Sequence, residues 1–201
     1  YKGEALHGKT VLLFCEGGLG DEMIFARFAR IPKERGAQHV IIGCSPQLVE
    51  IFSRAFLGTA ADEVLPMSEA KKRFYDFYIP MMNAPNLLTV ENPSVTFPYL
   101  KPDPERVAFW KKKLDAIAGG KLKIGIRWAG NRKFEHEQFR TINPKLLTEF
   151  KKYGQLFSLQ RDFGASWLPH NHSIHDLRYD LKDWDDTLAV LANLDLLISS
   201  C

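Results

Sequence analysis

Short, fully apolar segments, each followed by a loop and a helical pattern, constrain this fold most. Residues 9–14 (KTVLLF) lead into a glycine-rich loop at 15–20 (CEGGLG) and a helical pattern over residues 21–35. A second apolar run, residues 40–43 (VIIG), precedes Ser45, Pro46 and a helical stretch over 47–55. Strands that are apolar throughout are typical of parallel sheets with helices on both faces. The sequence therefore predicts an α/β protein.

The same alternation starts again near residue 122. Weaker strands at 63–65 and 74–79 precede a proline-rich segment up to residue 104, which can continue neither a helix nor a central strand. Residues 105–118 are predicted to be helical. Further strands are expected at 122–128, 154–159 and 194–199, and helices at 144–153 and 185–193. We expect a first domain over 1–104, a linking helix over 105–121, and a second domain over 122–201 that ends after three strands and is incomplete.

Cysteine usage, charge and hydropathy narrow the class of protein. The three cysteines are an odd number, and Cys15 and Cys44 lie in apolar segments, so we expect a reducing compartment, the cytoplasm, rather than a disulfide framework. No apolar run reaches the roughly 18 residues that span a bilayer. The net charge of +3 is too small to indicate a nucleic-acid partner. The chain starts at Tyr1 and ends at Cys201 directly after an apolar run, so we expect it to be part of a longer protein.

The first candidate site is the loop between the first strand and the first helix. Ligands of open α/β sheets bind at this edge, and Gly18 and Gly20 let backbone N–H groups approach a ligand closely. Three carboxylates, Glu16, Asp21 and Glu22, would repel a phosphate, so the loop suits a neutral hydroxyl. A carboxylate here is able to accept a proton as a general base. The alternative is that Asp21 only caps the helix.

Two common nucleotide-binding motifs, the dinucleotide-binding fingerprint and the P-loop, do not fit this loop. The glycine spacing at 17, 18 and 20 is not G-x-G-x-x-G, and no acidic residue follows the second strand to hold a ribose, which disfavours a nicotinamide-dependent oxidoreductase. A P-loop is excluded because no Gly-Lys-Ser/Thr follows the glycines.

The second candidate site has the opposite charge. Residues 128–131 (WAGN) follow the first strand of the second domain, and Arg127, Arg132, Lys133 and Arg140 surround this small-residue turn. Cations and small-residue backbone together favour a diphosphate. A solvated basic loop is the alternative interpretation. Taken together, the acidic and basic loops suggest a cleft in which a hydroxyl acceptor meets an anionic donor.

Two further groups of residues are assigned to structure rather than to chemistry. The spacing of His170, His172 and His175 fits neither a helical i, i+4 pair nor a zinc finger, so we predict a loop without metal. The four tryptophans are predicted to pack in the core or between lobes, with base stacking by Trp128 as the alternative. They are Trp110, Trp128, Trp167 and Trp184.

Several segments, taken in order, resemble a known family. They are FCEGGLGDEMIFARFARI, PMMNAPNLLTV, KIGIRWAGN, FRTI, LFSLQRD and DLKDWDDTLAVLANLDLLIS. They look like the glycosyltransferase domain that follows tetratricopeptide repeats in bacterial proteins, which is similar to the ADP-heptose heptosyltransferases. The resemblance implies a GT-B architecture of two Rossmann-like lobes with parallel sheets, and an enzyme that needs no metal or other cofactor. It also implies sugar transfer with inversion from a nucleotide-diphosphate-sugar to a carbohydrate or protein hydroxyl.

The resemblance also assigns residues. Asp21 matches the proposed general base, and Arg140 matches a basic residue near the donor phosphates. The first lobe is the acceptor side and the second the nucleotide-sugar side, and upstream repeats would bind a protein partner. The acceptor residues expected are Glu16, Gly18, Gly20 and Arg27. The donor residues expected are Trp128, Gly130, Asn131, Arg140, Gln160 and Arg161. The alternative function is a non-catalytic binding module of a repeat-containing scaffold.

Overall fold

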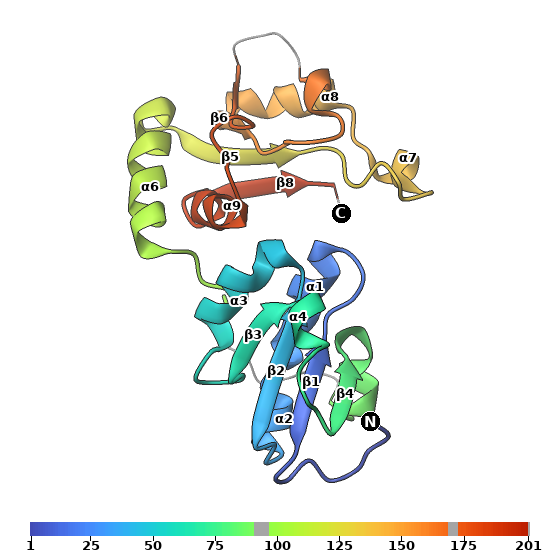
Figure 1. The fold of residues 1–201 in the computed structure, drawn as a ribbon. Helices are drawn as coiled ribbons and strands as arrows, with labels where there is room; N and C mark the ends of the chain where they lie inside the picture. The colour runs from blue at the N-terminus through green and yellow to red at the C-terminus, as the bar shows by residue number, and fades with distance from the viewer. Residues whose placement is uncertain (91–96, 169–172, 201) are drawn as a thin grey trace. The chain divides into compact units, whose positions relative to one another are not determined.

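The computed structural model describes residues 1–90, 97–168 and 173–200, and the chain forms two compact units, Tyr1–Lys101 and Pro102–Cys201 (Figure 1). Each unit has its own four-stranded sheet, and every neighbouring pair of strands is parallel. The predicted α/β class with two parallel sheets is therefore confirmed.

The first unit contains a sheet of order β3-β2-β1-β4. Its strands are β1 (Thr10–Phe14), β2 (His39–Cys44), β3 (Glu63–Pro66) and β4 (Phe77–Pro80). Its α-helices are α1 (Leu19–Phe25), α2 (Ile31–Glu34), α3 (Val49–Phe56), α4 (Met67–Ala70) and α5 (Ala84–Leu87). Its 3-10 turns are η1 (Ala26–Phe28), η2 (Pro46–Leu48) and η3 (Met81–Asn83). The two central strands, β1 and β2, are the apolar runs from which the fold was predicted.

The second unit repeats this plan with the order β7-β6-β5-β8. Its strands are β5 (Leu122–Arg127), β6 (Gly154–Ser158), β7 (Ile174–Asp176) and β8 (Leu196–Ser199). Its helices are α6 (Pro104–Ala118), α7 (Glu137–Arg140), α8 (Pro144–Leu147) and α9 (Trp184–Leu191), with 3-10 turns η4 (Thr148–Lys152) and η5 (Ala165–Trp167).

Alternate side chains of β6 fill two separate cores in the second unit. Phe157 packs with α6 and α9 on one face of the sheet, whereas Leu156 packs with α8 on the other (Figure 1). This alternation follows from the two-residue period of a strand. The helix α6 packs against α9 and so belongs to the core of the second unit.

Three predicted helices are divided in the structure, among them the one expected over 47–55, which is η2 followed by α3. The helix expected over residues 21–35 is divided into α1, η1 and α2, because Pro32 lacks the N–H that a continuous helix would use. The helix expected over 144–153 is α8 followed by η4.

The prediction of three strands in the second unit was wrong, because β7 makes a fourth. Its three residues, with Ile174 alone apolar and buried, are too few to show a strand period in the sequence.

Both sheets change direction beside their first strand. From β1 the chain adds β2 and β3 on one side and then places β4 on the other; β5 is flanked by β6 and β8 in the same way. Such a change in strand order leaves a crevice outside the carboxyl ends of the strands, where ligands of open α/β sheets bind. The acidic loop follows β1 and the basic loop follows β5. Both predicted sites therefore start at such a point.

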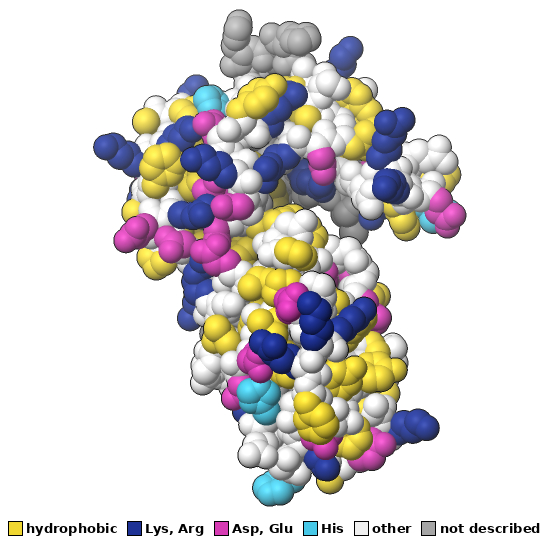
Figure 2. All heavy atoms as spheres, viewed as in Figure 1, with side chains coloured by type: hydrophobic (Ala, Val, Ile, Leu, Met, Phe, Trp, Pro, Cys, Tyr) yellow, Lys and Arg dark blue, Asp and Glu magenta, His cyan; other side chains and the backbone are white. Residues whose placement is uncertain are grey.

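The surface carries charges of both signs. Figure 2 shows Lys and Arg side chains interspersed with Asp and Glu side chains on the visible face of each unit. Within the described ranges, no helix is long and apolar enough to cross a membrane.

Candidate functional site

In the acidic loop, Asp21 is held by its own loop. Its Oδ2 accepts a hydrogen bond from the backbone N–H of Gly18 at 2.8 Å, and the residue as a whole is partly exposed. Gly17 has a φ of +85°, and a Cβ there would lie 2.8 Å from Asp21 Oδ2. A glycine is therefore needed at 17 for both conformation and space. The carboxylate is thus held by its loop in a residue that is partly exposed.

Glu22, the next residue, is buried and joins two loops. One carboxylate oxygen accepts the backbone N–H of Ser45 at 2.9 Å, and the other accepts the Ser45 hydroxyl. Ser45 follows β2, so Glu22 ties the loop after β2 to the loop after β1. Burial, together with the nearby Glu22 carboxylate, raises the pKa of Cys15 and raises that of Cys44 to about 12, so both free thiols stay protonated at neutral pH.

Three of the other predicted acceptor residues have no direct link to Asp21 among the described contacts. Within the part of the chain that the structure describes, no hydrogen bond or ion pair links Glu16, Gly20 or Arg27 to Asp21. The guanidinium of Arg27 lies 5.2 Å from the ring centroid of Phe28, and its Nε is buried without a hydrogen-bond partner among the described residues.

In the basic loop, Gln160 is the central hydrogen-bonding side chain. It is fully buried, and its Oε1 accepts the backbone N–H groups of Trp128 at 3.1 Å and Ala129 at 3.0 Å. Its Nε2 donates to the carbonyls of Ala129 at 3.0 Å and Phe163 at 2.7 Å. One amide thus fastens the loop after β5 to the loop after β6.

Trp128 is also buried completely, and its indole N–H donates to the carbonyl of Gly164 at 3.0 Å. Because the ring faces no solvent, it has no surface on which a base can stack in this structure. Its contacts instead add a second link between the same two loops.

Arg140 is paired with a carboxylate that the sequence analysis did not single out. Glu137 accepts hydrogen bonds from Arg140 Nη2 at 2.6 Å and Nε at 3.2 Å, and also from the backbone N–H of Gly130. Burial raises the pKa of this carboxyl, but the hydrogen bonds from Arg140 and Gly130 outweigh that effect and hold it below its usual value. The two side chains are three residues apart, a spacing typical of a helical ion pair.

The remaining two predicted donor residues are exposed. Asn131 Oδ1 accepts the backbone N–H of Lys133 at 3.0 Å, which closes a local turn. Arg161 donates to the carbonyl of Lys182 at 3.1 Å. The assembly therefore contains the buried residues Trp128, Gly130 and Gln160 and the half-buried Arg140, and Asn131 and Arg161 lie outside it.

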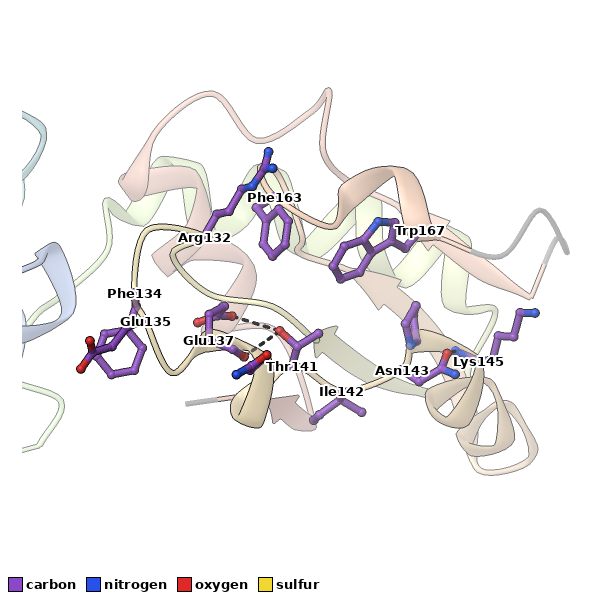
Figure 3. Close-up of a pocket in the computed structure, with 12 residues that line it drawn as sticks. Arg132, Phe134, Glu135, Glu137, Thr141, Ile142, Asn143, Lys145, Phe163 and Trp167 are labelled. Atoms are coloured by element: carbon purple, nitrogen blue, oxygen red, sulfur yellow. Dashed lines mark hydrogen bonds between the residues drawn. The ribbon is translucent and has the colours of Figure 1, made fainter.

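A cavity of about 740 Å³ opens beside this assembly (Figure 3). Arg132, Phe163 and Trp167 lie along one side of it, and Thr141, Ile142, Asn143 and Lys145 along the other. Phe163 and Trp167 meet edge to face with ring centroids 4.9 Å apart, and Arg132 lies 5.7 Å from the Phe163 ring centroid. The volume is within the range of small-molecule sites, about 300–1,000 Å³.

The six predicted donor residues do not line this cavity; their neighbours do. Trp167 is 43% exposed and forms part of the cavity wall, so it is not the core residue that the sequence analysis expected as one of two alternatives. A signal was available, since Phe163 and Trp167 follow Gln160 and Arg161 in the loop after β6.

The histidine group is only partly described. His170 and His172 lie outside the described residues, and the His175 ring packs 6.0 Å from the Phe157 ring centroid.

Comparisons with known proteins can be set beside this geometry. No family model matches the chain. It is 27% identical to protein FlbA of Caulobacter vibrioides over an alignment of 232 residues, which covers 98% of this chain but only 37% of the length of FlbA. Among solved structures it matches a glycosyl transferase family 9 protein from Veillonella parvula, with a TM-score of 0.68 and 10% identity.

That match covers 99% of this chain and 77% of the Veillonella protein. The chain has the fold of a family 9 glycosyl transferase. The predicted GT-B-like fold class, with one parallel sheet in each unit, is thus confirmed.

Proposed function

We propose that this chain is a glycosyltransferase domain that transfers a sugar from a nucleotide-diphosphate-sugar to a hydroxyl acceptor. The observation that supports this function best is that a glycosyltransferase-like fold occurs together with two polar loops at its ligand-binding edges. The fold is similar to a glycosyl transferase, and in each sheet a polar loop follows the strand beside which the strand order changes. One loop is acidic and the other basic, which suits an acceptor hydroxyl and an anionic donor respectively.

In the proposed reaction, Asp21 is the general base. Its Oδ2 is engaged by Gly18, so Oδ1, which accepts no hydrogen bond from the described residues, takes the proton of the acceptor hydroxyl. The acceptor oxygen then forms a bond to the anomeric carbon as the bond to the diphosphate breaks, and the nucleoside diphosphate leaves with the electron pair. The acceptor is a carbohydrate or a protein side chain, and Glu16, Gly18, Gly20 and Arg27 form its side of the site.

The donor is assigned to the second unit. The cavity offers aromatic rings for a base, with Arg132 and Lys145 as cations and Glu135 and Glu137 as carboxylates in its lining. The residues expected at the donor site support or flank that lining. They are Trp128, Gly130, Asn131, Arg140, Gln160 and Arg161. Because Glu137 is already paired with Arg140, the cations Arg132 and Lys145 and the aromatic rings are the groups proposed to bind a nucleotide diphosphate.

The wider setting is part of the same proposal. We place the protein in the cytoplasm because Cys15 and Cys44 are buried free thiols. Tetratricopeptide repeats outside this chain would recruit a protein partner, which rests on the sequence resemblance. The chemistry is proposed to need no metal.

A second function is favoured by one contact. Because Gly18 already occupies Asp21 Oδ2, the carboxylate is also placed as a loop cap, as expected for a non-catalytic binding module. Turnover distinguishes the two functions.

The test is a thermal-shift screen of the intact protein with UDP-, GDP-, ADP- and CDP-sugars, followed by calorimetry and a transfer assay. Arg140→Ala should weaken binding of the selected donor about tenfold or more, since a hydrogen bond to a charged group contributes about 1.5–3 kcal/mol. Lys151→Ala, which removes an exposed cation outside the cavity lining, is the matched control. Binding of none of these donors would overturn the proposal, and binding without turnover would favour the binding module.

A further inference from the structure

The carboxylate of Glu137 is the most heavily bonded acid beside the cavity. It is 5% exposed, although it lies on the single-turn helix α7. Oε1 accepts the backbone N–H of Gly130 and, at 3.3 Å, the hydroxyl of Thr141, whereas Oε2 accepts both Arg140 bonds. Figure 3 shows Glu137 and Thr141 joined beside the cavity. Oε1 therefore binds the loop that contains Gly130, and Oε2 binds the guanidinium of Arg140.

Arg140 is fixed from more than one direction. Glu137 takes its Nε–Nη2 edge, and the Phe134 ring centroid lies 4.4 Å from the guanidinium carbon. A Cβ at residue 130 would lie 2.9 Å from both Arg140 Nη2 and Glu137 Oε2, so only glycine fits there without a shift. An anion that approaches Arg140 would meet the Nη1 side, because the other edge is occupied.

The same contacts change what the loop after β5 offers a ligand. Gly130 was expected to present its backbone to a phosphate, yet its N–H donates to Glu137. A phosphate could take the place of this carboxylate only by moving a buried charge away from its partners, and unpaired buried charges are costly. The ion pair therefore indicates that the Glu137 carboxylate stays in place when a ligand binds and is not displaced by a phosphate.

On the basis of the function proposed above, we propose that Glu137 is a positioning residue for donor binding. It holds the Gly130 backbone and the Nε–Nη2 edge of Arg140, and so directs Nη1 toward the donor diphosphate. The charge of Arg140, rather than the N–H of Gly130, then recognises the phosphate.

The experiment is a double-mutant cycle in the intact protein, with calorimetric binding of the donor that the screen selects. Glu137→Gln keeps the shape but removes the charge, and should weaken binding about tenfold, within the range for residues in direct contact. Its kcat at saturating donor should stay near that of the natural protein, so the change appears in KM. In the Arg140→Ala background, Glu137→Gln should cost no further affinity.

The outcomes separate this inference from the proposed function. If the natural protein binds no nucleotide-sugar, both fall. If it binds and Glu137→Gln binds equally well or more tightly, or if the two losses are additive, only the positioning role is overturned. Should Glu137→Gln fail to fold, Arg140→Lys replaces it. Lysine keeps the charge without the two-point contact, so wild-type affinity in Arg140→Lys would overturn the role and a loss close to that of Arg140→Ala would support it.

Discussion

The loops after β1 and β5 lie at equivalent places in two sheets of the same topology, yet they are stabilised by different chemistry. In the first, Glu22 is buried and accepts only neutral donors from Ser45 among its described contacts, while Asp21 stays partly exposed. In the second, the buried acid is paired with Arg140 and a buried amide, Gln160, binds the backbone. One topology thus supports a partly exposed acid in the first unit and a paired cation in the second.

Because of this difference, we expect a substitution at Asp21 to lower kcat and one at Arg140 to weaken donor binding. The largest effect is expected at Asp21. Asp21→Asn should lower kcat about 100-fold or more, the usual contribution of a general base, and leave donor affinity nearly unchanged. Initial rates and calorimetry on the intact protein measure the two quantities separately. Glu34→Gln, an exposed carboxylate on α2, is the control for a lost surface charge. Unchanged turnover in Asp21→Asn would reduce Asp21 to a loop cap and remove the contrast with Arg140.

The next effect concerns stability and tests whether the second loop depends on its amide. Gln160→Met keeps the approximate volume but leaves the N–H groups of Trp128 and Ala129 unpaired, at about 1–3 kcal/mol each. For a unit of about 100 residues this lowers Tm by about 10 °C or more. Thermal unfolding followed by circular dichroism measures it.

Ser45→Ala is the matched change in the first unit, because it removes the hydroxyl that Glu22 accepts and leaves the backbone bond intact. It should cost about 1 kcal/mol. Equal losses in Ser45→Ala and Gln160→Met would mean that the two loops are held by similar energies.

The smallest effect is expected at the cavity wall. Trp167→Ala should weaken donor binding about 2- to 10-fold, since an aromatic contact contributes about 0.5–1.5 kcal/mol beyond its area. Tyr153→Ala removes an exposed ring outside the cavity lining and should not change affinity. If Trp167→Ala binds as tightly as the natural protein, the base does not occupy this cavity.

Sequence alone was sufficient for the central strands but not for the contacts of the site. β1 and β2 were predicted because they are short apolar runs, and β5, β6 and β8 because the strand-helix alternation starts again near residue 122. β7 has one apolar residue and was missed. The two loops were located because parallel strands bring their carboxyl ends to one edge.

The roles of individual loop residues were harder to predict. Gln160 was selected for its place on a loop, but its burial depends on two backbone segments that are far apart in sequence. Glu137 was missed because its contact with Gly130 spans a turn whose shape no residue pattern specifies. Only its spacing to Arg140 was readable from the sequence.

The division between buried support and exposed cavity wall bears on how such a domain can diversify. Hydrogen bonds and close packing confine Gln160, Glu137 and Gly130. Most substitutions at these positions would therefore disturb the loop after β5, and those at Gln160 the loop after β6 as well. Trp167, Lys145 and Arg132 are exposed at the cavity, and the backbone beneath them is held by other residues. Substitutions at these three cavity residues can therefore change ligand preference without lowering folding stability. They are the positions to vary in a mutant library.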